Sequence, residues 1–243
     1  METSRKIRLG VINAVAAAGK GHLGGALSCA DILNAIYFHA KKPEDVFILS
    51  KGHAGVALYA TLVQAGYLSQ DELLKLNQEG LLGEHPDTRI PGVDVSTGSL
   101  GQGLGVGCGM ALAGNRVFVL MGDGECQEGS VWEAAMFAAH QALDLVVVID
   151  RNDYQVQGST EEINALEPLA DKWRSFGWFV KTCDGHDLEA LGIAMMDKCK
   201  PLCVIANTIK GKGVSFMEAN HDWHHGSLKG EFLEQARREL GTA

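Results

Sequence analysis

The stretch that decides the fold is RVFVLMGDGECQEGSVWEAAMFAAHQALDLVVVIDRNDYQVQ, residues 116–157. Its first apolar run, residues 117–121, is short and rich in β-branched side chains, which predicts a strand buried on both faces of a parallel sheet. An acidic glycine turn and a predicted helix over residues 130–141 follow. A second apolar run, residues 145–149, ends in the polar loop 150–154. Because a right-handed βαβ crossover places two such strands side by side, their carboxyl ends share one edge of the sheet.

Polar side chains follow both strands. Asp123 lies in the turn GDGE, and Asn152 follows it by 29 positions, so we expect the two to converge. Mg²⁺ takes about six oxygens, usually only one or two of them from carboxylates. Asp123, the Asn152 amide and a main-chain carbonyl near Tyr154 would supply three, and Gly122 and Gly124 would let backbone N–H groups approach phosphates. An ordinary strand-end turn is the alternative, but the placement between two buried strands favours the metal site.

Composition excludes several classes of protein. A chain of 243 residues with 46% hydrophobic content predicts one globular α/β domain over residues 1–243. The net charge of −9 and the lack of a Lys/Arg run argue against a nucleic-acid partner. The six cysteines form no C-x-x-C pair, which favours reduced core thiols and a cytoplasmic location. No stretch of 18 or more apolar residues and no signal-peptide pattern is found, so no membrane partner is expected.

Three histidines lie in short loops beside glycine or proline. His22 follows a predicted helix over residues 4–18, His53 follows a predicted strand over residues 46–49, and His85 lies in the loop of residues 80–95. One such histidine would be interpreted as a loop residue that bonds its own backbone. Three together favour a functional role, because imidazole can donate to a phosphate or a developing alkoxide and exchange protons near neutral pH.

The other elements alternate between helices and strands. Ser28 with Asp31, and Ser69 with Glu72, have the spacing of helix capping boxes, while His186 is expected to be structural. Five strands alternating with helices predict an α/β fold: a doubly wound, mostly parallel sheet with helices on both faces and ligands at the carboxyl edge of its strands. The further strands are predicted over residues 178–183 and 202–207, and the further helices over residues 56–65, 168–176, 188–198 and 231–240.

The glycine-rich run STGSLGQGLGVGCG, residues 96–109, is not interpreted as a dinucleotide fingerprint, because it follows a loop and not the first strand of a βαβ unit. Residues 98–102 are expected to contact a cofactor. Residues 105–109 predict a narrow helix that packs closely, either within the chain or across a subunit interface. The tail residues 210–213 and 221–226 carry donors that could close over a phosphate, although a solvated loop is the alternative.

A series of motifs in one order resembles the transketolase family of thiamine diphosphate enzymes. The resemblance covers nearly the whole chain, with Lys20 and Leu23 as departures from the family's first motif. The motifs are GHLGG (21–25), SKGH (50–53), HPD (85–87), PGV (91–93), TGSLGQG (97–103), GDGE (122–125) and WHHG (223–226).

The resemblance implies roles for individual residues. Asp123, Asn152 and the Tyr154 carbonyl would hold Mg²⁺ or Ca²⁺. His22, His85 and either His224 or His225 would act in catalysis, facing the sugar. Glu128 and Glu133 match carboxylates between subunits, a solvated helix start being the alternative. The residues expected to contact thiamine diphosphate are His53, Ser99, Leu100, Gly122, Gly124, Glu125, Asn152 and Lys210.

The resemblance also implies a partner. The segment corresponds to the diphosphate-binding half of transketolase, without the half that holds the aminopyrimidine ring and the activating glutamate. We therefore expect the N-terminal subunit of a split transketolase, transferring a two-carbon ketol unit from a ketose phosphate to an aldose phosphate. Its partner would be a C-terminal subunit with the pyrimidine-binding domain, in a hetero-oligomer with a homodimeric contact. The alternatives are a non-catalytic cofactor-binding module and another thiamine diphosphate enzyme, such as deoxyxylulose phosphate synthase.

Overall fold

The computed structural model describes residues 2–78 and 80–241, and its centre is a five-stranded parallel sheet. The strands lie in the order β2–β3–β4–β6–β5. Every residue of β3 and β4 is buried, as the apolar runs predicted, whereas β5 at the edge is partly exposed. The strands are β2 (Val46–Leu49), β3 (Val117–Gly122), β4 (Leu145–Arg151), β5 (Phe179–Asp184) and β6 (Leu202–Asn207).

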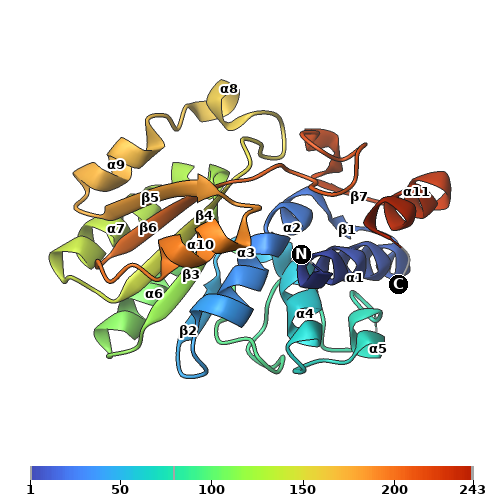
Figure 1. Ribbon diagram of the computed structural model, residues 1–243, viewed down its shortest axis with the longest axis horizontal. Helices are drawn as coiled ribbons and strands as arrows, with labels where there is room; N and C mark the ends of the chain where they lie inside the picture. The colour runs from blue at the N-terminus through green and yellow to red at the C-terminus, as the bar shows by residue number, and fades with distance from the viewer. Residues whose placement is uncertain (1, 79, 242–243) are drawn as a thin grey trace.

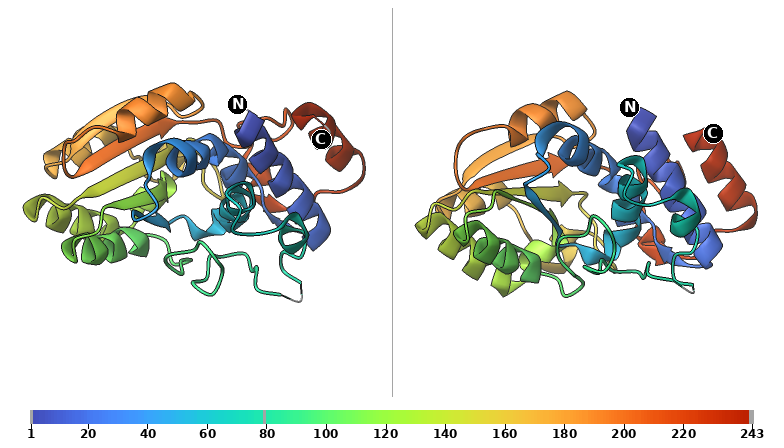
Figure 2. Two further views of the ribbon diagram at one scale, coloured as in Figure 1. Left: turned by 60° about the horizontal axis from the view of Figure 1, so that its bottom comes forward. Right: turned by 90° about the horizontal axis from the view of Figure 1, so that it is seen from below.

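Helices cover both faces of the sheet, which confirms the predicted doubly wound architecture (Figures 1 and 2). Phe118 and Leu120 of β3 face a core formed with α1–α4, α10 and α11, while Val117 and Val119 face a core formed with α6, α7 and α9. None of the described helices is long and apolar enough to cross a membrane. The bounds are α1 (Glu2–Ala18), α2 (Gly24–Ser28), α3 (Ala30–Ala35), α4 (Gly55–Gln64), α5 (Gln70–Leu73), α6 (Gln102–Leu112), α7 (Gly129–His140), α8 (Thr160–Asn164), α9 (Leu169–Ser175), α10 (Leu188–Met195) and α11 (Gly230–Leu240).

A two-stranded ribbon joins the first histidine loop to the tail of the chain. Strand β1 (Gly21–His22) pairs antiparallel with β7 (His225–Gly226), so that His22 lies opposite His225. Helix α11 then packs beside α1 (Figure 1), where Arg5 Nη1 donates to the Leu240 carbonyl at 3.3 Å. The ribbon thus brings two motifs about 200 residues apart in the sequence to one place.

One of the two predicted capping boxes is wrong. Ser69 and Glu72 do form the reciprocal pair at the start of α5. Ser28, however, is the last residue of α2, and its hydroxyl donates to Asp150 at 2.6 Å, with the Gly25 carbonyl 3.1 Å away. Asp31 binds Arg8 and His186 instead of capping α3. Both side chains therefore bind buried partners elsewhere in the fold and do not cap the helix as their spacing had indicated.

Helix α6 offers a matched pair of glycines for testing the packing. A Cβ added at Gly103 would lie 2.5 Å from Ser50 Cβ and 2.9 Å from Ser50 Cα, whereas one at Gly109 would meet nothing within 4 Å. We expect Gly103→Ala to lower the free energy of unfolding by about 1–3 kcal/mol through overpacking. Gly109→Ala should leave it unchanged or raise it by up to about 1 kcal/mol. Urea denaturation of the isolated chain measures both, and equal stability of the two variants would contradict this packing.

Candidate functional site

The turn after β3 and the loop after β4 are joined by hydrogen bonds at the carboxyl edge of the sheet. The register of the two strands pairs Gly122 with Asp150. The Asp123 amide donates to the Asp150 carbonyl at 3.3 Å, and the Asp153 amide donates to Asp123 Oδ2 at 2.7 Å. Asp123 and Asn152 are both buried, and both line one cavity of about 270 Å³.

The structure brings most of the predicted site residues to this cavity. Ser99 lines a neighbouring hollow instead, together with Gln102 and Val106. His85 and His225 are not among the lining residues, although their rings lie 6.4 and 4.6 Å from that of His22. The lining residues are His22, Gly25, Lys51, His53, Gly98, Leu100, Gly122, Asp123, Gly124, Glu125, Asn152, Tyr154, Gln155, Val156, Lys210 and His224.

A buried ion pair, which the sequence analysis missed, lies beside the cavity. The Lys51 ammonium binds the Asp150 carboxylate, and both side chains are almost wholly inaccessible to solvent. Asp150 also accepts from the Ser28 and Thr208 hydroxyls and from the Asn152 amide. Burial alone would raise the pKa of Asp150, but the charge and hydrogen bond of Lys51 lower it below its usual value. The site therefore holds a carboxylate that is ionised and fully bonded.

Glu125 connects the acidic turn to the glycine-rich loop. Its carboxylate accepts from the Ser50 hydroxyl, from the Gly101 amide at 2.9 Å and from the Gly122 amide at 3.1 Å. Burial raises the pKa of this carboxyl. Because both oxygens are engaged by the protein, Glu125 fixes the positions of Gly101 and Leu100 at the cavity wall.

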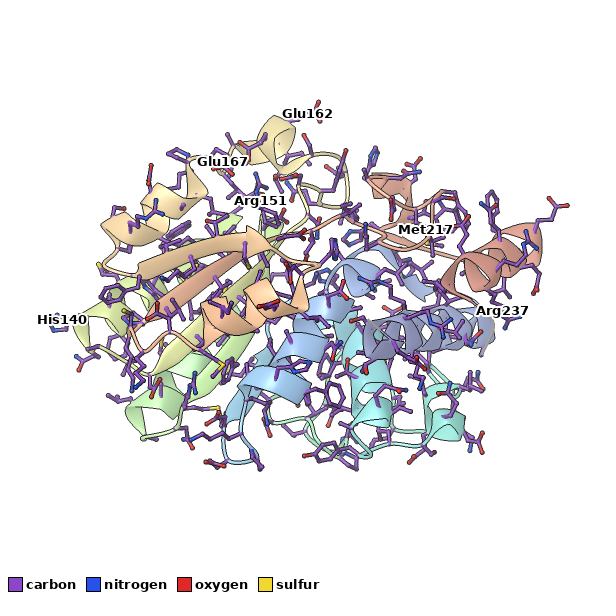
Figure 3. All side chains as sticks on the ribbon, viewed as in Figure 1. His140, Arg151, Glu162, Glu167, Met217 and Arg237 are labelled. Carbon is purple, nitrogen blue, oxygen red and sulfur yellow. The ribbon has the colours of Figure 1, made fainter. Side chains whose placement is uncertain are left out.

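Asp123 is held by a buried arginine that the sequence analysis also missed. Arg151 Nη1 lies 3.2 Å from Asp123 Oδ2, while Nη2 lies 3.1 Å from Glu161 Oε1 and 3.0 Å from Glu167 Oε1. Figure 3 shows Arg151 and Glu167 near one another above the sheet. Burial, and then the charge of Asp150, raise the pKa of Asp123 to about 6 despite the arginine. A cation is therefore favoured beside this carboxylate.

Five histidines surround the mouth of the cavity. The ring of His224 stacks on that of His53 with the centroids 5.3 Å apart, and the ring of His22 lies 5.5 Å from that of His224 and 5.4 Å from that of His53. His224 Nδ1 lies 2.9 Å from the Lys210 ammonium, whereas His225 points toward Glu84. Of the doubled histidines, His224 is thus the one that lines the cavity.

Burial keeps the inner histidines neutral. It lowers the pKa of His22 to about 4, with the nearby His225 adding to the effect, and the pKa of His224 to about 3, with Lys210 adding to it. The pKa of His53 is lowered well below its usual value by burial and by the charge of Lys51. Burial and the charge of Lys51 also lower the pKa of Lys210 to about 8.

These groups can bind a hard cation and an anion together. Oxygens for a divalent metal come from the Asp123 carboxylate, Asn152 Oδ1 and the Tyr154 carbonyl, which lies 3.4 Å from the Lys210 ammonium. Lys210 supplies positive charge for an anion, and the glycines of the lining leave backbone groups accessible. The set fits a diphosphate held through a metal.

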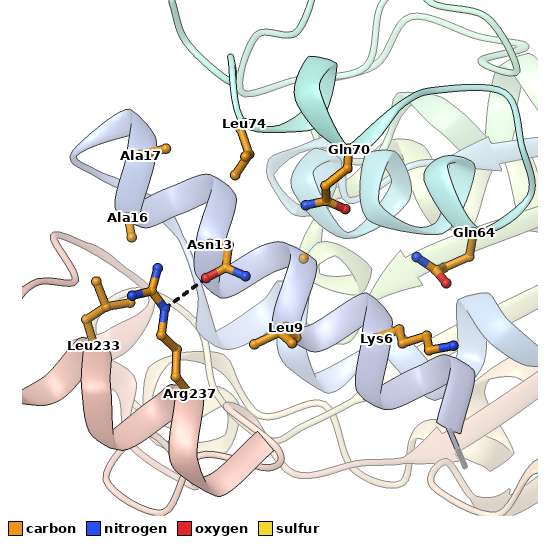
Figure 4. A pocket seen from close by; sticks show the side chains of 11 residues that line it. Lys6, Leu9, Asn13, Ala16, Ala17, Gln64, Gln70, Leu74, Leu233 and Arg237 are labelled. Atoms are coloured by element: carbon orange, nitrogen blue, oxygen red, sulfur yellow. Dashed lines mark hydrogen bonds between the residues drawn. The ribbon is translucent and has the colours of Figure 1, made fainter. Parts of the chain in front are cut away.

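A larger cavity of about 840 Å³ lies elsewhere, between α1, α5 and α11 (Figure 4). Leu9, Ala16, Leu74 and Leu233 contribute apolar surface, and Arg237 Nε donates to Asn13 Oδ1 at 3.0 Å. It contains none of the predicted site residues, so the smaller cavity at the sheet edge remains the candidate site.

Comparisons with known proteins agree on one family. Residues 2–243 match the family described as "Transketolase, thiamine diphosphate binding domain". The chain is 43% identical to an apulose-4-phosphate transketolase subunit of Phocaeicola vulgatus, covering 98% of this chain and 92% of the relative. It is 45% identical to 6-deoxy-6-sulfo-D-fructose transketolase subunit SqwG of a Clostridium species, covering 91% and 89%.

Solved structures agree with the sequence relatives. An arginine-to-leucine mutant of transketolase from Pichia stipitis superposes with a TM-score of 0.91 at 32% identity. The superposition covers 98% of this chain but 40% of the transketolase chain. The chain thus spans about two fifths of that longer protein and nearly all of the two subunits named above.

The neutral histidines predict a pH-dependent stability. Between about pH 6.5 and pH 4, the unfolded chain binds protons at His22, His53 and His224 that the folded chain does not, so the free energy of unfolding falls as the pH is lowered. Each proton contributes about 1.4 kcal/mol per pH unit. In urea denaturation with chelator and without cofactor, His224→Gln should lower the slope of the unfolding free energy against pH by the contribution of about one proton. An unchanged slope would contradict the burial of an uncharged ring at residue 224.

Proposed function

The chain belongs to the transketolase family, as its thiamine diphosphate-binding domain, and on this premise we propose that it is the N-terminal subunit of a split transketolase. Its two close relatives are named as transketolase subunits and match it over nearly their whole length. The observation that carries the proposal is the single cavity that contains Asp123, Asn152 and the inner histidines. The reaction would transfer a two-carbon ketol unit from a ketose phosphate to an aldose phosphate.

The residues that would hold the cofactor lie along the cavity. Mg²⁺, or Ca²⁺, would bind Asp123, Asn152 and the Tyr154 carbonyl, and the diphosphate would lie against the glycines of the turn, Lys210 and His53. The cavity's volume of about 270 Å³ is just below the range of roughly 300–1,000 Å³ for pockets that enclose a whole ligand. This favours burial of the diphosphate part, with the rest covered by another chain. When bound, thiamine diphosphate supplies the carbon that carries the transferred unit.

The histidines would bind the sugar and move its protons. A neutral imidazole donates at one nitrogen and accepts at the other, so it can hold a hydroxyl group or take its proton. His224 accepts at Nδ1 from Lys210, so the neutral ring carries its proton on Nε2, and this ring lines the cavity. His22, whose Nδ1 is buried without a hydrogen-bond partner among the described residues, is the second candidate, with His85 and His225 at the margin.

The partner would supply the remaining part of the site. The chain spans about two fifths of the solved transketolase, and we propose that a C-terminal subunit carries the pyrimidine-binding domain. A homodimeric contact is supported by exposed apolar side chains on α6 and α7, namely Val106, Leu112, Met136 and Phe137. Glu128 and Glu133 are exposed near this surface, where they could link two sites.

We propose that the substrates carry a terminal anion. One relative is named for apulose 4-phosphate and the other for 6-deoxy-6-sulfo-D-fructose, so both names specify a compound that carries a phosphate or a sulfo group. A cytoplasmic location is proposed from the six free cysteines, which suit a reducing compartment.

The direct test is a two-carbon transfer assay. The chain is mixed with its C-terminal subunit, thiamine diphosphate, Mg²⁺, a ketose phosphate and an aldose phosphate, and the products are identified by mass spectrometry. Transfer should require both chains. A complex that binds cofactor but transfers nothing with phosphate or sulfonate ketoses would favour a non-catalytic cofactor-binding module.

Loss of the charge at residue 123 should abolish tight cofactor binding. In the complex, Asp123→Asn removes one of few metal-ligand charges, and we expect the Kd for thiamine diphosphate with Mg²⁺ to rise at least about 100-fold, measured by titration calorimetry. Asp153→Asn is the matched control, because it removes the same charge from a side chain that is 64% exposed, in the loop that follows β4 at the same edge of the sheet. The metal assignment fails if both variants bind the cofactor as tightly as the unchanged chain.

A histidine at the mouth should affect turnover more than cofactor binding. We expect His22→Ala to lower kcat by about 100-fold, because a positioned proton donor or acceptor is lost. The Kd for the cofactor should change less than about threefold, since the proposed metal ligands are untouched. Steady-state kinetics and calorimetry on the same complex separate the two effects, and a loss of cofactor binding equal to the loss of rate would refute this role.

A further inference from the structure

A second cluster of ligand-type side chains lies just outside the cavity, on the ribbon formed by β1 and β7. His22 and His225 are directly opposite each other in this antiparallel pair, so their side chains project from the same face. Their ring centroids are 4.6 Å apart. Glu84, from the loop before His85, completes the cluster, and one ligand atom of each residue lies within 4.8 Å of the other two.

The contacts inside the cluster converge on one centre and leave one nitrogen unused. Glu84 Oε1 lies 3.3 Å from His225 Nε2, and Glu84 Oε2 lies 4.0 Å from His22 Nδ1. The latter nitrogen is buried and has no hydrogen-bond partner in the described part of the chain. An unpartnered buried polar atom normally costs free energy, so its orientation toward a carboxylate calls for a ligand.

We propose that His22, Glu84 and His225 form a binding site for a late first-row divalent cation such as Zn²⁺. Zinc bonds of about 2.0–2.1 Å place tetrahedral ligand atoms about 3.3–3.4 Å apart. The 3.3 Å between Glu84 Oε1 and His225 Nε2 already matches, whereas His22 Nδ1 lies 4.0 Å from the other carboxylate oxygen, Oε2. Rotation of the partly exposed Glu84 and His225 side chains would bring one oxygen and both nitrogens to this spacing. Two imidazoles and one carboxylate leave at least one coordination position open.

The ligand set separates this site from the proposed Mg²⁺ site. Mg²⁺ prefers oxygen ligands, whereas two imidazole nitrogens favour Zn²⁺, Co²⁺ or Ni²⁺. The backbone of Glu84 is packed tightly against Gly55: a Cβ added at Gly55 would lie 2.7 Å from the Glu84 carbonyl oxygen. This contact holds Glu84 in place. Since His22 lines the cavity as well, an ion bound here would restrict access to the cavity.

The test is zinc binding to the full chain without cofactor, sugar or partner. Competition of Zn²⁺ with a chromophoric chelator gives the Kd and stoichiometry, and Co²⁺ absorption reports the ligands. We expect one equivalent of Zn²⁺, bound at least about 10-fold more weakly after Glu84→Gln or His225→Gln. His221→Gln is the matched control, because His221 is a partly exposed histidine of the same tail segment outside the cluster, and it should change the Kd less than about twofold.

Two further arms make the outcome decisive. Asp123→Asn should bind Zn²⁺ as the unchanged chain does, and millimolar Mg²⁺ should not displace it. The proposal is overturned if Glu84→Gln and His225→Gln both bind Zn²⁺ normally, if Asp123→Asn loses it, or if alkylation of the free thiols abolishes it. Because no arm uses thiamine diphosphate, the zinc site and the proposed transketolase function stand or fall separately.

Discussion

The site depends on the parallel pairing of β3 with β4. Because the register places Gly122 beside Asp150, the residues that follow the two strands leave the sheet together, and the Asp153 amide closes the arrangement on the Asp123 carboxylate. Strands buried on both faces cannot slip by one residue without turning every side chain to the opposite core. The apolar sequence of two strands therefore fixes the spacing of an acid and an amide that belong to different loops.

The charged side chains that line the cavity or lie beside it are mostly paired with side chains of opposite sign. Lys51 and Asp150 neutralise each other in a fully buried pair, whose removal on one side would leave an uncompensated charge. Arg151 meets Asp123 on the side toward Glu161 and Glu167. Burial still raises the pKa of Asp123 and lowers that of Lys210, so both charges favour counter-ions. A divalent cation with a diphosphate would supply both signs at once.

The sequence predicted what local patterns determine. Each of the five strands of the sheet, the Ser69 cap and the convergence of Asp123 with Asn152 followed from apolar runs and turn residues. The place of His22 and His53 beside them was expected only from the family resemblance. The sequence analysis missed side chains whose partners are distant in the sequence. In the sequence, Arg151 and Lys51 cannot be told from exposed charged residues, because only the folded structure shows that they are buried. Glu84 belongs to no motif that would indicate a role. Ser28 failed as a cap for the same reason, since its hydroxyl reaches Asp150, 122 positions away.

The five histidines show why the order of motifs was informative where individual residues were not. His22, His53 and His85 come from three loops, and the ribbon of β1 and β7 adds His224 and His225 from the tail. Burial makes the inner rings neutral, and therefore able to accept as well as donate. The outer ring, His225, is turned toward Glu84 and is exposed to solvent. The two adjacent histidines thus lie in different environments. His224 lines the cavity, whereas His225 contacts Glu84, a residue that no local sequence pattern connected to it.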